Sequence, residues 1–238
     1  MKNLDQLKAV TFDVFGTVVD WRSSIAREMN LIGDKKELSI DGAEFASAWR
    51  SLYQPSMSKV RSGEMPFERL DVLHRRNLDT VLEQYDIDQL SELEKVHLNQ
   101  AWHRLEPWPD VVEGLVRLKE RYIIGTLSNG NVSLIVNMAK YSGLPWDVVL
   151  GAEVAGHYKP CPEAYLGSAK KLDLPPHQCM LVAAHNADLL AASECGFKTA
   201  FVARPTDYGP DQTTDLSADH EFDVIATDFV DLAGQLQA

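Results

Sequence analysis

The sequence has little of what a secreted, membrane-spanning or disulfide-rich protein needs. Its 238 residues hold only three cysteines, and their spacing fits neither a disulfide framework nor a paired metal site. The sequence has no apolar run of about 18 residues that could span a bilayer. Its first eight residues carry three charged side chains where a signal peptide would be apolar. We therefore expect a cytoplasmic protein with no membrane partner.

Positive charge is also scarce. The chain has 23 Lys and Arg against 35 Asp and Glu, a formal net charge of -12, and no basic cluster offsets this excess. We therefore expect no nucleic-acid partner. An anionic small substrate requires instead that a few basic residues be focused inside a pocket. With 45% hydrophobic and 24% charged residues, the composition is typical of a globular protein long enough for one large domain or a domain with an insert.

One short stretch near the start carries the first chemical signal. Residues 9–12 form an apolar, β-branched and aromatic run typical of a buried strand, and Asp13 stands where this run ends. A carboxylate at the carboxyl end of a central strand in an open α/β sheet points into the crevice where ligands bind. Gly16 permits a sharp turn, and Thr17 offers a hydroxyl to the carboxylate. Asp13 is thus either a positioned nucleophile or a cap for the following turn.

A long helical block follows this stretch. Apolar residues recur at intervals of three and four along residues 21–30, 43–60, 66–84 and 89–104, and Pro55 is expected to divide the second segment. This block is too large for a simple crossover between strands. We predict a helical cap domain over residues 20–104, inserted into a core domain made of residues 1–19 and 105–238.

From residue 107 the pattern alternates between helix and strand, as in a doubly wound, Rossmann-like parallel sheet. We predict strands over 122–127, 148–150, 180–184, 198–203 and 222–225, with helices over 111–120, 132–141, 163–172, 187–194 and 228–236. Residues 205–219 are expected to form a polar surface loop. The predicted fold class is therefore α/β with an inserted helical cap.

Three later segments place polar residues where they can meet Asp13. They are Ser128-Asn129, Lys159 before Pro160, and Asp188 in the stretch 183–188. Together with Asp13, and in this order, they resemble the four motifs of the haloacid dehalogenase superfamily. The motif set spans nearly the whole chain outside the helical insert, which makes it far more specific than any single motif.

Two substitutions within these motifs indicate a branch of the superfamily. The phosphatases resemble D-x-D at the first motif and carry further acids at the fourth, where carboxylates hold magnesium. This chain has Phe15 and Ala184 at those positions, so metal-dependent phosphoryl transfer is disfavoured and we expect no cofactor. The first motif is similar to D-x-Y-G-T of the type II L-2-haloacid dehalogenases, whose chemistry uses no metal.

This resemblance implies a metal-independent hydrolase that converts short (S)-2-haloacids to (R)-2-hydroxyacids through an ester on Asp13, and it implies a homodimer. Asp13 is then the nucleophile, supported by Thr17. The resemblance implies further roles in substrate and halide binding, charge compensation and water activation for Val14, Phe15, Arg50, Ser128, Asn129, Lys159, Tyr165, His185 and Asp188. Tyr165 is expected to line the site, and Asp188 to orient or activate water.

The fourth motif departs from the family pattern. The dehalogenases resemble S-S-N-x-x-D there, whereas this chain has Ala183, Ala184 and His185. His185 is a candidate replacement as hydrogen-bond partner or base, because imidazole titrates near neutral pH. Two other functions stay open from the sequence: a magnesium-dependent phosphatase of the same superfamily and a non-catalytic binding module.

Each later site residue also has an ordinary structural interpretation. Lys159 could lie in a surface loop, and the segment 128–130 could be a plain turn. Arg50 could cover an apolar helix face with its stem. His185 could simply bond a backbone carbonyl at a strand end.

Overall fold

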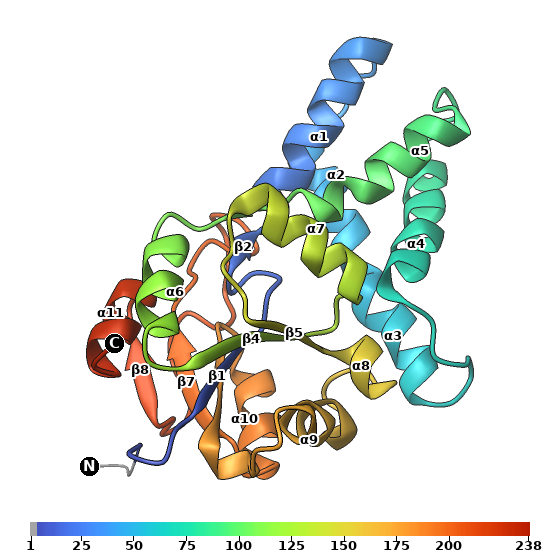
Figure 1. Ribbon diagram of the computed structural model, residues 1–238. Coiled ribbons are helices and arrows are strands. Elements are labelled where there is room, and N and C mark those ends of the chain that lie inside the picture. Colours follow the sequence, from blue (N-terminus) through green and yellow to red (C-terminus); the bar gives the residue numbers. More distant parts are fainter. Residues whose placement is uncertain (1–3) are drawn as a thin grey trace.

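The computed structural model describes residues 4–238 (Figure 1). Six strands form one parallel sheet in the order β5-β4-β1-β6-β7-β8. The strands are β1 (Ala9–Phe12), β4 (Ile123–Ser128), β5 (Val148–Gly151), β6 (Cys179–Ala183), β7 (Lys198–Val202) and β8 (Val224–Ala226). This sheet confirms the predicted doubly wound α/β class.

Helices cover both faces of the sheet, so its central strands are apolar on both sides. On one face Phe12 packs against Phe229 with ring centroids 5.3 Å apart. On the other, Leu181 lies in a cluster with Tyr165 and Leu189. The core helices are α6 (Val111–Lys119), α7 (Val132–Ser142), α8 (Ala152–Ala155), α9 (Pro162–Lys171), η2 (Pro176–Gln178), α10 (Asn186–Glu194) and α11 (Phe229–Gln235).

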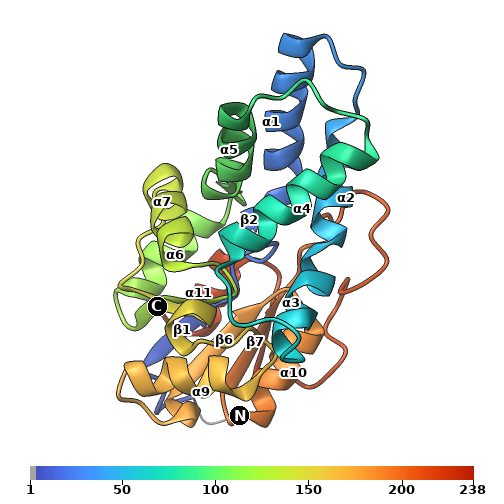
Figure 2. The same cartoon turned by 90° about the vertical axis from the view of Figure 1, so that its right-hand side faces the viewer.

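A second group of helices lies between β1 and β4 in the chain and extends away from the sheet (Figures 1 and 2). Arg50 and Tyr53 of this group line the same cavity as Asp13, so it covers the carboxyl end of β1. Its elements are α1 (Trp21–Lys36), α2 (Gly42–Ser51), α3 (Tyr53–Arg61), α4 (Leu70–Gln84), α5 (Glu92–Asn99) and η1 (Gln100–His103). We propose residues 20–104 as the cap domain and residues 1–19 and 105–238 as the core.

Local sequence explains where the cap helices begin and end. Asp41 accepts hydrogen bonds from Ala43 and Glu44 at the start of α2, as an N-cap should. Pro55 lies in the first turn of α3, where backbone N–H groups have no acceptor within the helix, so the N–H that proline lacks is not needed there. The predicted segment 43–60 is accordingly divided in two at Leu52.

The structure also differs from the predicted elements in places. Residues 19–20 (β2) and 106–107 (β3) pair as short antiparallel strands where the chain enters and leaves the cap, and the sequence pattern did not predict them. Two-residue strands are too short to show an alternating pattern. Helix α1 runs to Lys36 instead of residue 30, and β8 begins at Val224 instead of residue 222.

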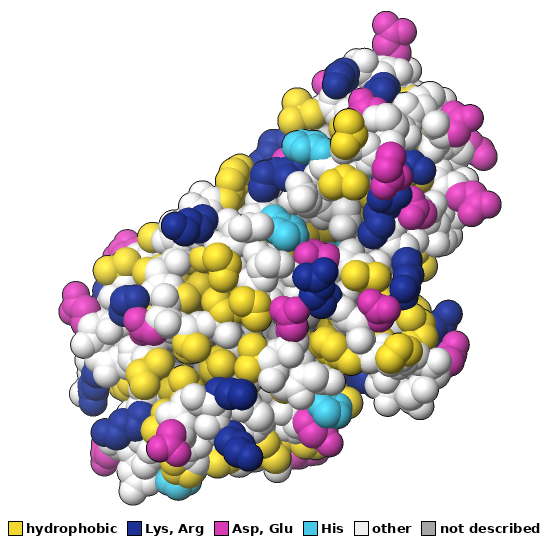
Figure 3. All heavy atoms as spheres, turned by 45° about the vertical axis from the view of Figure 1, so that its right-hand side comes forward, with side chains coloured by type: hydrophobic (Ala, Val, Ile, Leu, Met, Phe, Trp, Pro, Cys, Tyr) yellow, Lys and Arg dark blue, Asp and Glu magenta, His cyan; other side chains and the backbone are white. Residues whose placement is uncertain are grey.

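The described surface matches the acidic composition. On the face drawn in Figure 3, Lys and Arg side chains are scattered among Asp and Glu instead of gathering in one area. Across residues 4–238, every helix is too short or too polar to cross a membrane.

Candidate active site

Asp13 follows β1 directly and is held on both carboxylate oxygens. Its backbone N–H donates to the Val182 carbonyl (3.0 Å), which continues the pairing of β1 with β6. The Thr17 hydroxyl donates to Asp13 Oδ2 (2.8 Å) and accepts from the backbone N–H of Ala184 (2.9 Å). Because a hydroxyl has only one hydrogen, the bond from Ala184 directs that hydrogen to Asp13. Thr17 is fully buried, and these two hydrogen bonds fix its hydroxyl, so it holds the Asp13 carboxylate in position.

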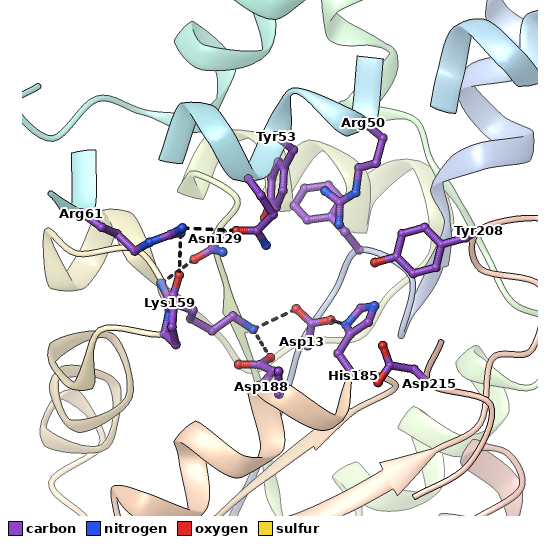
Figure 4. Close-up of a pocket in the computed structure, with 14 residues that line it drawn as sticks. Asp13, Arg50, Tyr53, Arg61, Asn129, Lys159, His185, Asp188, Tyr208 and Asp215 are labelled. Carbon is purple, nitrogen blue, oxygen red and sulfur yellow. Dashed lines mark hydrogen bonds and ion pairs between the residues drawn. The ribbon is translucent and has the colours of Figure 1, made fainter. Parts of the chain in front are cut away.

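Lys159 links Asp13 to the fourth motif (Figure 4). Its buried ammonium lies 2.9 Å from Asp13 Oδ1 and 2.5 Å from Asp188 Oδ2. The Asn129 side chain accepts from the Lys159 backbone N–H (2.8 Å) and so fixes the loop that carries it. Burial alone would lower the pKa of Lys159, but attraction to the two carboxylates outweighs this and raises the pKa. Lys159 is therefore charged at neutral pH.

The second oxygen of Asp188 is also bonded, because the Tyr165 hydroxyl donates to Asp188 Oδ1 (2.6 Å). Tyr165 is fully buried behind Asp188 and is not among the residues that line the cavity. The ring of Tyr165 packs in the core, and its contact with the site is the hydrogen bond from its hydroxyl to Asp188, so direct contact of Tyr165 with a substrate stays a prediction. Burial and the neighbouring Asp188 raise the pKa of Tyr165, so its hydroxyl stays protonated.

His185 lies between two carboxylates. Its Nδ1 is 3.1 Å from Asp13 Oδ2, and its Nε2 is 3.1 Å from Asp207 Oδ2. The indole N–H of Trp21 donates to the other oxygen of Asp207 (2.5 Å). Burial would lower the pKa of His185, but the bonds to Asp13 and Asp207 raise it well above its ordinary value of 6.5. The imidazole is therefore protonated and donates to both carboxylates.

These contacts decide the ionisation of Asp13. Burial would raise the pKa of its carboxyl, but attraction to Lys159 and to protonated His185 outweighs burial and holds the pKa well below the usual 3.8. Asp13 is ionised throughout the neutral range. An ionised, buried carboxylate with each oxygen bonded is suited to nucleophilic attack.

The loop over residues 205–219 is largely exposed, as the sequence predicted, but three of its residues also reach the site. Asp207 is only 2% exposed, and Tyr208 and Asp215 line the cavity. The loop follows β7, whose carboxyl end lies at the same edge of the sheet as Asp13. A second signal is Gly16, whose φ is +87° and where a Cβ would collide with the Asp207 carboxylate. Both the position of this loop after β7 and the close approach of Asp207 to Gly16 follow from the fold, so the sequence alone did not indicate that the loop reaches the site.

Arg50 approaches Asp13 from the cap side of the cavity (Figure 4). Its guanidinium carbon lies 3.8 Å from the ring centroid of Tyr53, 5.4 Å from that of Trp21 and 5.8 Å from that of Phe15. Within residues 4–238, the buried Nη1 of Arg50 has no hydrogen-bond partner. A buried, unpaired guanidinium nitrogen is costly unless an anion satisfies it.

The cavity itself has a volume of about 420 Å³, which suits a small organic ligand. Seven of the site residues chosen from the sequence line it: Asp13, Phe15, Arg50, Asn129, Lys159, His185 and Asp188. Val14, Thr17 and Ser128 are fully buried beside it, and the Ser128 hydroxyl accepts from the Gly130 N–H (3.0 Å). The sequence did not indicate the remaining lining residues, which are Tyr53, Gln54, Arg61, Pro160, Ala187, Tyr208 and Asp215.

Comparison with known proteins places this site in a family. The family of haloacid dehalogenase-like hydrolases matches residues 7–196. The chain belongs to this hydrolase family. It is 29% identical over 204 residues to (S)-2-haloacid dehalogenase 4A of Burkholderia cepacia, with 84% of this chain and 85% of that protein covered.

Solved structures are more similar still. The crystal structure of the defluorinating L-2-haloacid dehalogenase Rha0230 shares 50% identity and a TM-score of 0.96, covering 98% of this chain and 96% of the other. The L-2-haloacid dehalogenase PA0810 shares 45% identity and a TM-score of 0.94, covering 97% of this chain and 99% of the other. The resemblance read from the four motifs is thereby confirmed.

Proposed function

We propose that this protein hydrolyses the carbon–halogen bond of short (S)-2-haloacids to give (R)-2-hydroxyacids, without a metal. The observation that carries the proposal is the ionised Asp13 carboxylate, which opens onto a cavity that is also lined by Arg50, whose buried Nη1 has no hydrogen-bond partner within residues 4–238. The similarity to L-2-haloacid dehalogenases of 45% and 50% identity supports the same substrate class.

In the first half of the reaction, an oxygen of Asp13 attacks the carbon that bears the halogen. A bond forms between that oxygen and the carbon, the carbon–halogen bond breaks, and halide leaves with the electron pair. Attack in line with the leaving group inverts the configuration at that carbon. The product of this half is an ester on Asp13, as expected of covalent catalysis by a carboxylate.

The charges around the cavity favour this step. A haloacid brings a second negative charge beside Asp13, and two anions repel strongly in a poorly hydrated pocket. Lys159 compensates Asp13 directly at 2.9 Å. We assign the leaving halide to Arg50, because its Nη1 lacks a partner within the described chain and its guanidinium lies against the rings of Phe15 and Tyr53. We assign the substrate carboxylate to the backbone amides around Val14 and Phe15, with Ser128 and Asn129.

A magnesium-dependent phosphatase fits the residues less well. Phe15 stands two residues after the nucleophile and has no proton to give to a leaving alkoxide. Ala184 has no oxygen in its side chain to offer a divalent ion, and Asp188 already accepts bonds from Lys159 and Tyr165. Magnesium requires near-octahedral oxygen coordination, and this donor set does not supply it.

Halide release from both enantiomers of 2-chloropropionate, with a chelator present, tests the proposal. We expect chloride and (R)-lactate from the (S) enantiomer, little turnover of the (R) enantiomer, and no effect of the chelator. Release of phosphate from aryl phosphates on adding magnesium, with no halide released from any short haloacid, would establish the phosphatase instead. Ligand binding without either reaction would establish a non-catalytic module.

Two further proposals concern the setting of the protein. We propose a homodimer, supported by the family resemblance and by Leu31 and Leu93, which are 62% and 82% exposed and line one groove on the cap. Light scattering at several protein concentrations tests it.

We also propose a cytoplasmic location, supported by three cysteines that all remain free.

A further inference from the structure

Asp207 lies outside all four motifs, yet it is the second partner of His185. Its Oδ2 is 3.1 Å from His185 Nε2, while His185 Nδ1 faces the nucleophilic carboxylate at 3.1 Å. We propose that His185 is the base that hydrolyses the Asp13 ester and that Asp207 is the positioning residue that directs it. The inference rests on the proposed dehalogenase function and adds a mechanism for its second half.

Asp207 is fixed firmly enough to select one tautomer of His185. It is 2% exposed, and the Trp21 indole holds its other oxygen at 2.5 Å. A carboxylate only accepts hydrogen bonds, so His185 Nε2 must carry a hydrogen. When the imidazole is neutral, the lone pair is then on Nδ1, which faces Asp13. This is the logic by which a buried aspartate orients the histidine of a catalytic triad.

Asp188 is less suited to take a proton from water. Lys159 donates to one of its oxygens at 2.5 Å, and the Tyr165 hydroxyl donates to the other at 2.6 Å. Each oxygen of Asp188 is therefore already occupied by a donor from the protein. Asp188 also keeps Lys159 in place beside Asp13. Asp188 is therefore better placed to position Lys159 than to activate water.

Formation of the ester switches His185 from acid to base. In the resting enzyme, protonated His185 donates to ionised Asp13. Once Asp13 is esterified, its negative charge is gone, so the pKa of His185 falls. His185 then releases its Nδ1 proton to solvent, and this proton accompanies the departing halide in the overall reaction.

The remaining protons balance without another reactant. Water adds to the ester carbonyl carbon while one of its protons moves to His185 Nδ1. The tetrahedral intermediate collapses, the bond from that carbon to the alkyl oxygen breaks, and the second water proton passes from the Asp13 carboxyl to the alkoxide. The products are the 2-hydroxyacid, ionised Asp13 and protonated His185, which is the resting state.

Several charged or titratable groups set the electrostatic environment of this histidine. Asp13 and Asp207 contact the imidazole, the Tyr208 ring centroid lies 6.3 Å from that of His185, and further groups line the same cavity. The latter are Arg50, Arg61, Lys159, Asp188 and Asp215. Ester formation removes the charge of Asp13, so Asp207 is then the carboxylate that still bonds His185. Removing Asp207 should therefore change the protonation of His185 more than removing any other of these groups.

The Asp207→Asn variant tests the inference with (S)-2-chloropropionate. If the Asn oxygen accepts from Trp21, its NH2 group faces His185 Nε2 and forces the imidazole hydrogen onto Nδ1, which removes the base. We expect a burst of about one chloride per enzyme, followed by turnover that is about 10²- to 10⁴-fold slower, the usual loss of a general base. Intact-protein mass spectrometry should find the propionate ester on Asp13.

The pH profile of ester hydrolysis separates positioning from mere support of the fold. In the wild type, single-turnover hydrolysis should slow as pH falls and Nδ1 becomes protonated. In Asp207→Asn, Nδ1 is protonated at every pH tested, so this acid limb should disappear. Asp215→Asn is the matched control. It removes a carboxylate from the same loop and cavity, but Asp215 bonds Asn186 instead of His185, so ester should not accumulate.

Two results would overturn the inference while leaving the dehalogenase function intact. One is an Asp207→Asn enzyme that slows chloride release without accumulating ester. The other is ester that accumulates only in Asp188→Asn. If Asp207→Asn does not fold, His185→Gln must accumulate the same ester, and its failure to do so also overturns the inference. Absence of chloride release by the wild type would instead contradict the proposed function.

Discussion

Replacing Lys159 by Met tests the electrostatic account of the site through stability. The ammonium of Lys159 is 6% exposed and lies 2.9 Å from Asp13 and 2.5 Å from Asp188. Met keeps much of the aliphatic stem but leaves two buried carboxylates without their shared cation. Each carboxylate then destabilises the charged form of the other.

The expected loss follows from the burial of this pair. Removing one partner of a buried ion pair costs about 3–5 kcal/mol, because an uncompensated charge remains in the interior. We expect a loss near the lower end, about 3 kcal/mol at pH 7, because one of the two carboxyls can take up a proton. Urea unfolding monitored by circular dichroism gives the free energy of unfolding directly.

The pH dependence has a defined sign. The folded-state pKa of Asp13 lies below its usual 3.8, so its contribution is complete above that value and is lost as pH falls through the folded pKa. The folded-state pKa of Lys159 lies above 10.5, so its contribution is complete below that value and is lost as pH rises through the folded pKa. The difference between wild type and variant should be largest between these limits and shrink below about pH 4.

Lys119→Met is the matched control, since Lys119 pairs with Asp147 at 2.7 Å but both side chains are more than a third exposed. An exposed pair of this kind is worth less than about 1 kcal/mol. If Lys159→Met loses no more stability than Lys119→Met at pH 7, the claim that Lys159 compensates two buried carboxylates is wrong.

The remaining predictions concern the nucleophile, the halide site and the turn. Asp13→Asn should abolish halide release, because an amide is not a nucleophile, while circular dichroism shows an unchanged fold; retained turnover would refute the assignment. Arg50→Lys should lower kcat/KM for chloride release by about 10-fold or more, since Lys cannot stack its charge on Tyr53 as the planar guanidinium does. Unchanged steady-state kinetics would refute the halide role. Gly16→Ala should destabilise by about 2 kcal/mol or more in urea unfolding, because φ is +87° and the new Cβ meets Asp207; a neutral effect would show that the turn tolerates both.

The sequence predicted those parts of the site whose signals are local. Residues 9–12 are apolar and uninterrupted, so the strand and the position of Asp13 at its end could be read directly. Ser128 likewise ends a strand that pairs with β1. Once the parallel sheet is assumed, its carboxyl ends bring these residues together without further information.

The parts that the sequence did not predict depend on contacts between distant segments. Asp207 is one of many acids in a polar stretch, and only the placement of its loop beside Gly16 and His185 distinguishes it. The bond from Tyr165 to Asp188 depends in the same way on the rotation of α9 about its axis, which decides which side chains of the helix face the site. Short pairs such as Val19 with Pro107 also need the fold to bring them together.

Isotope labelling in a single turnover tests most directly the claim that Asp13 forms the ester. With enzyme in excess over (S)-2-chloropropionate in ¹⁸O-water, the hydroxyl oxygen of the product should come from the Asp13 carboxylate and carry no label. The label should appear in the peptide that contains Asp13. Label in the first-turnover hydroxyacid, with none in that peptide, would show that water attacks the substrate directly and would contradict the mechanism.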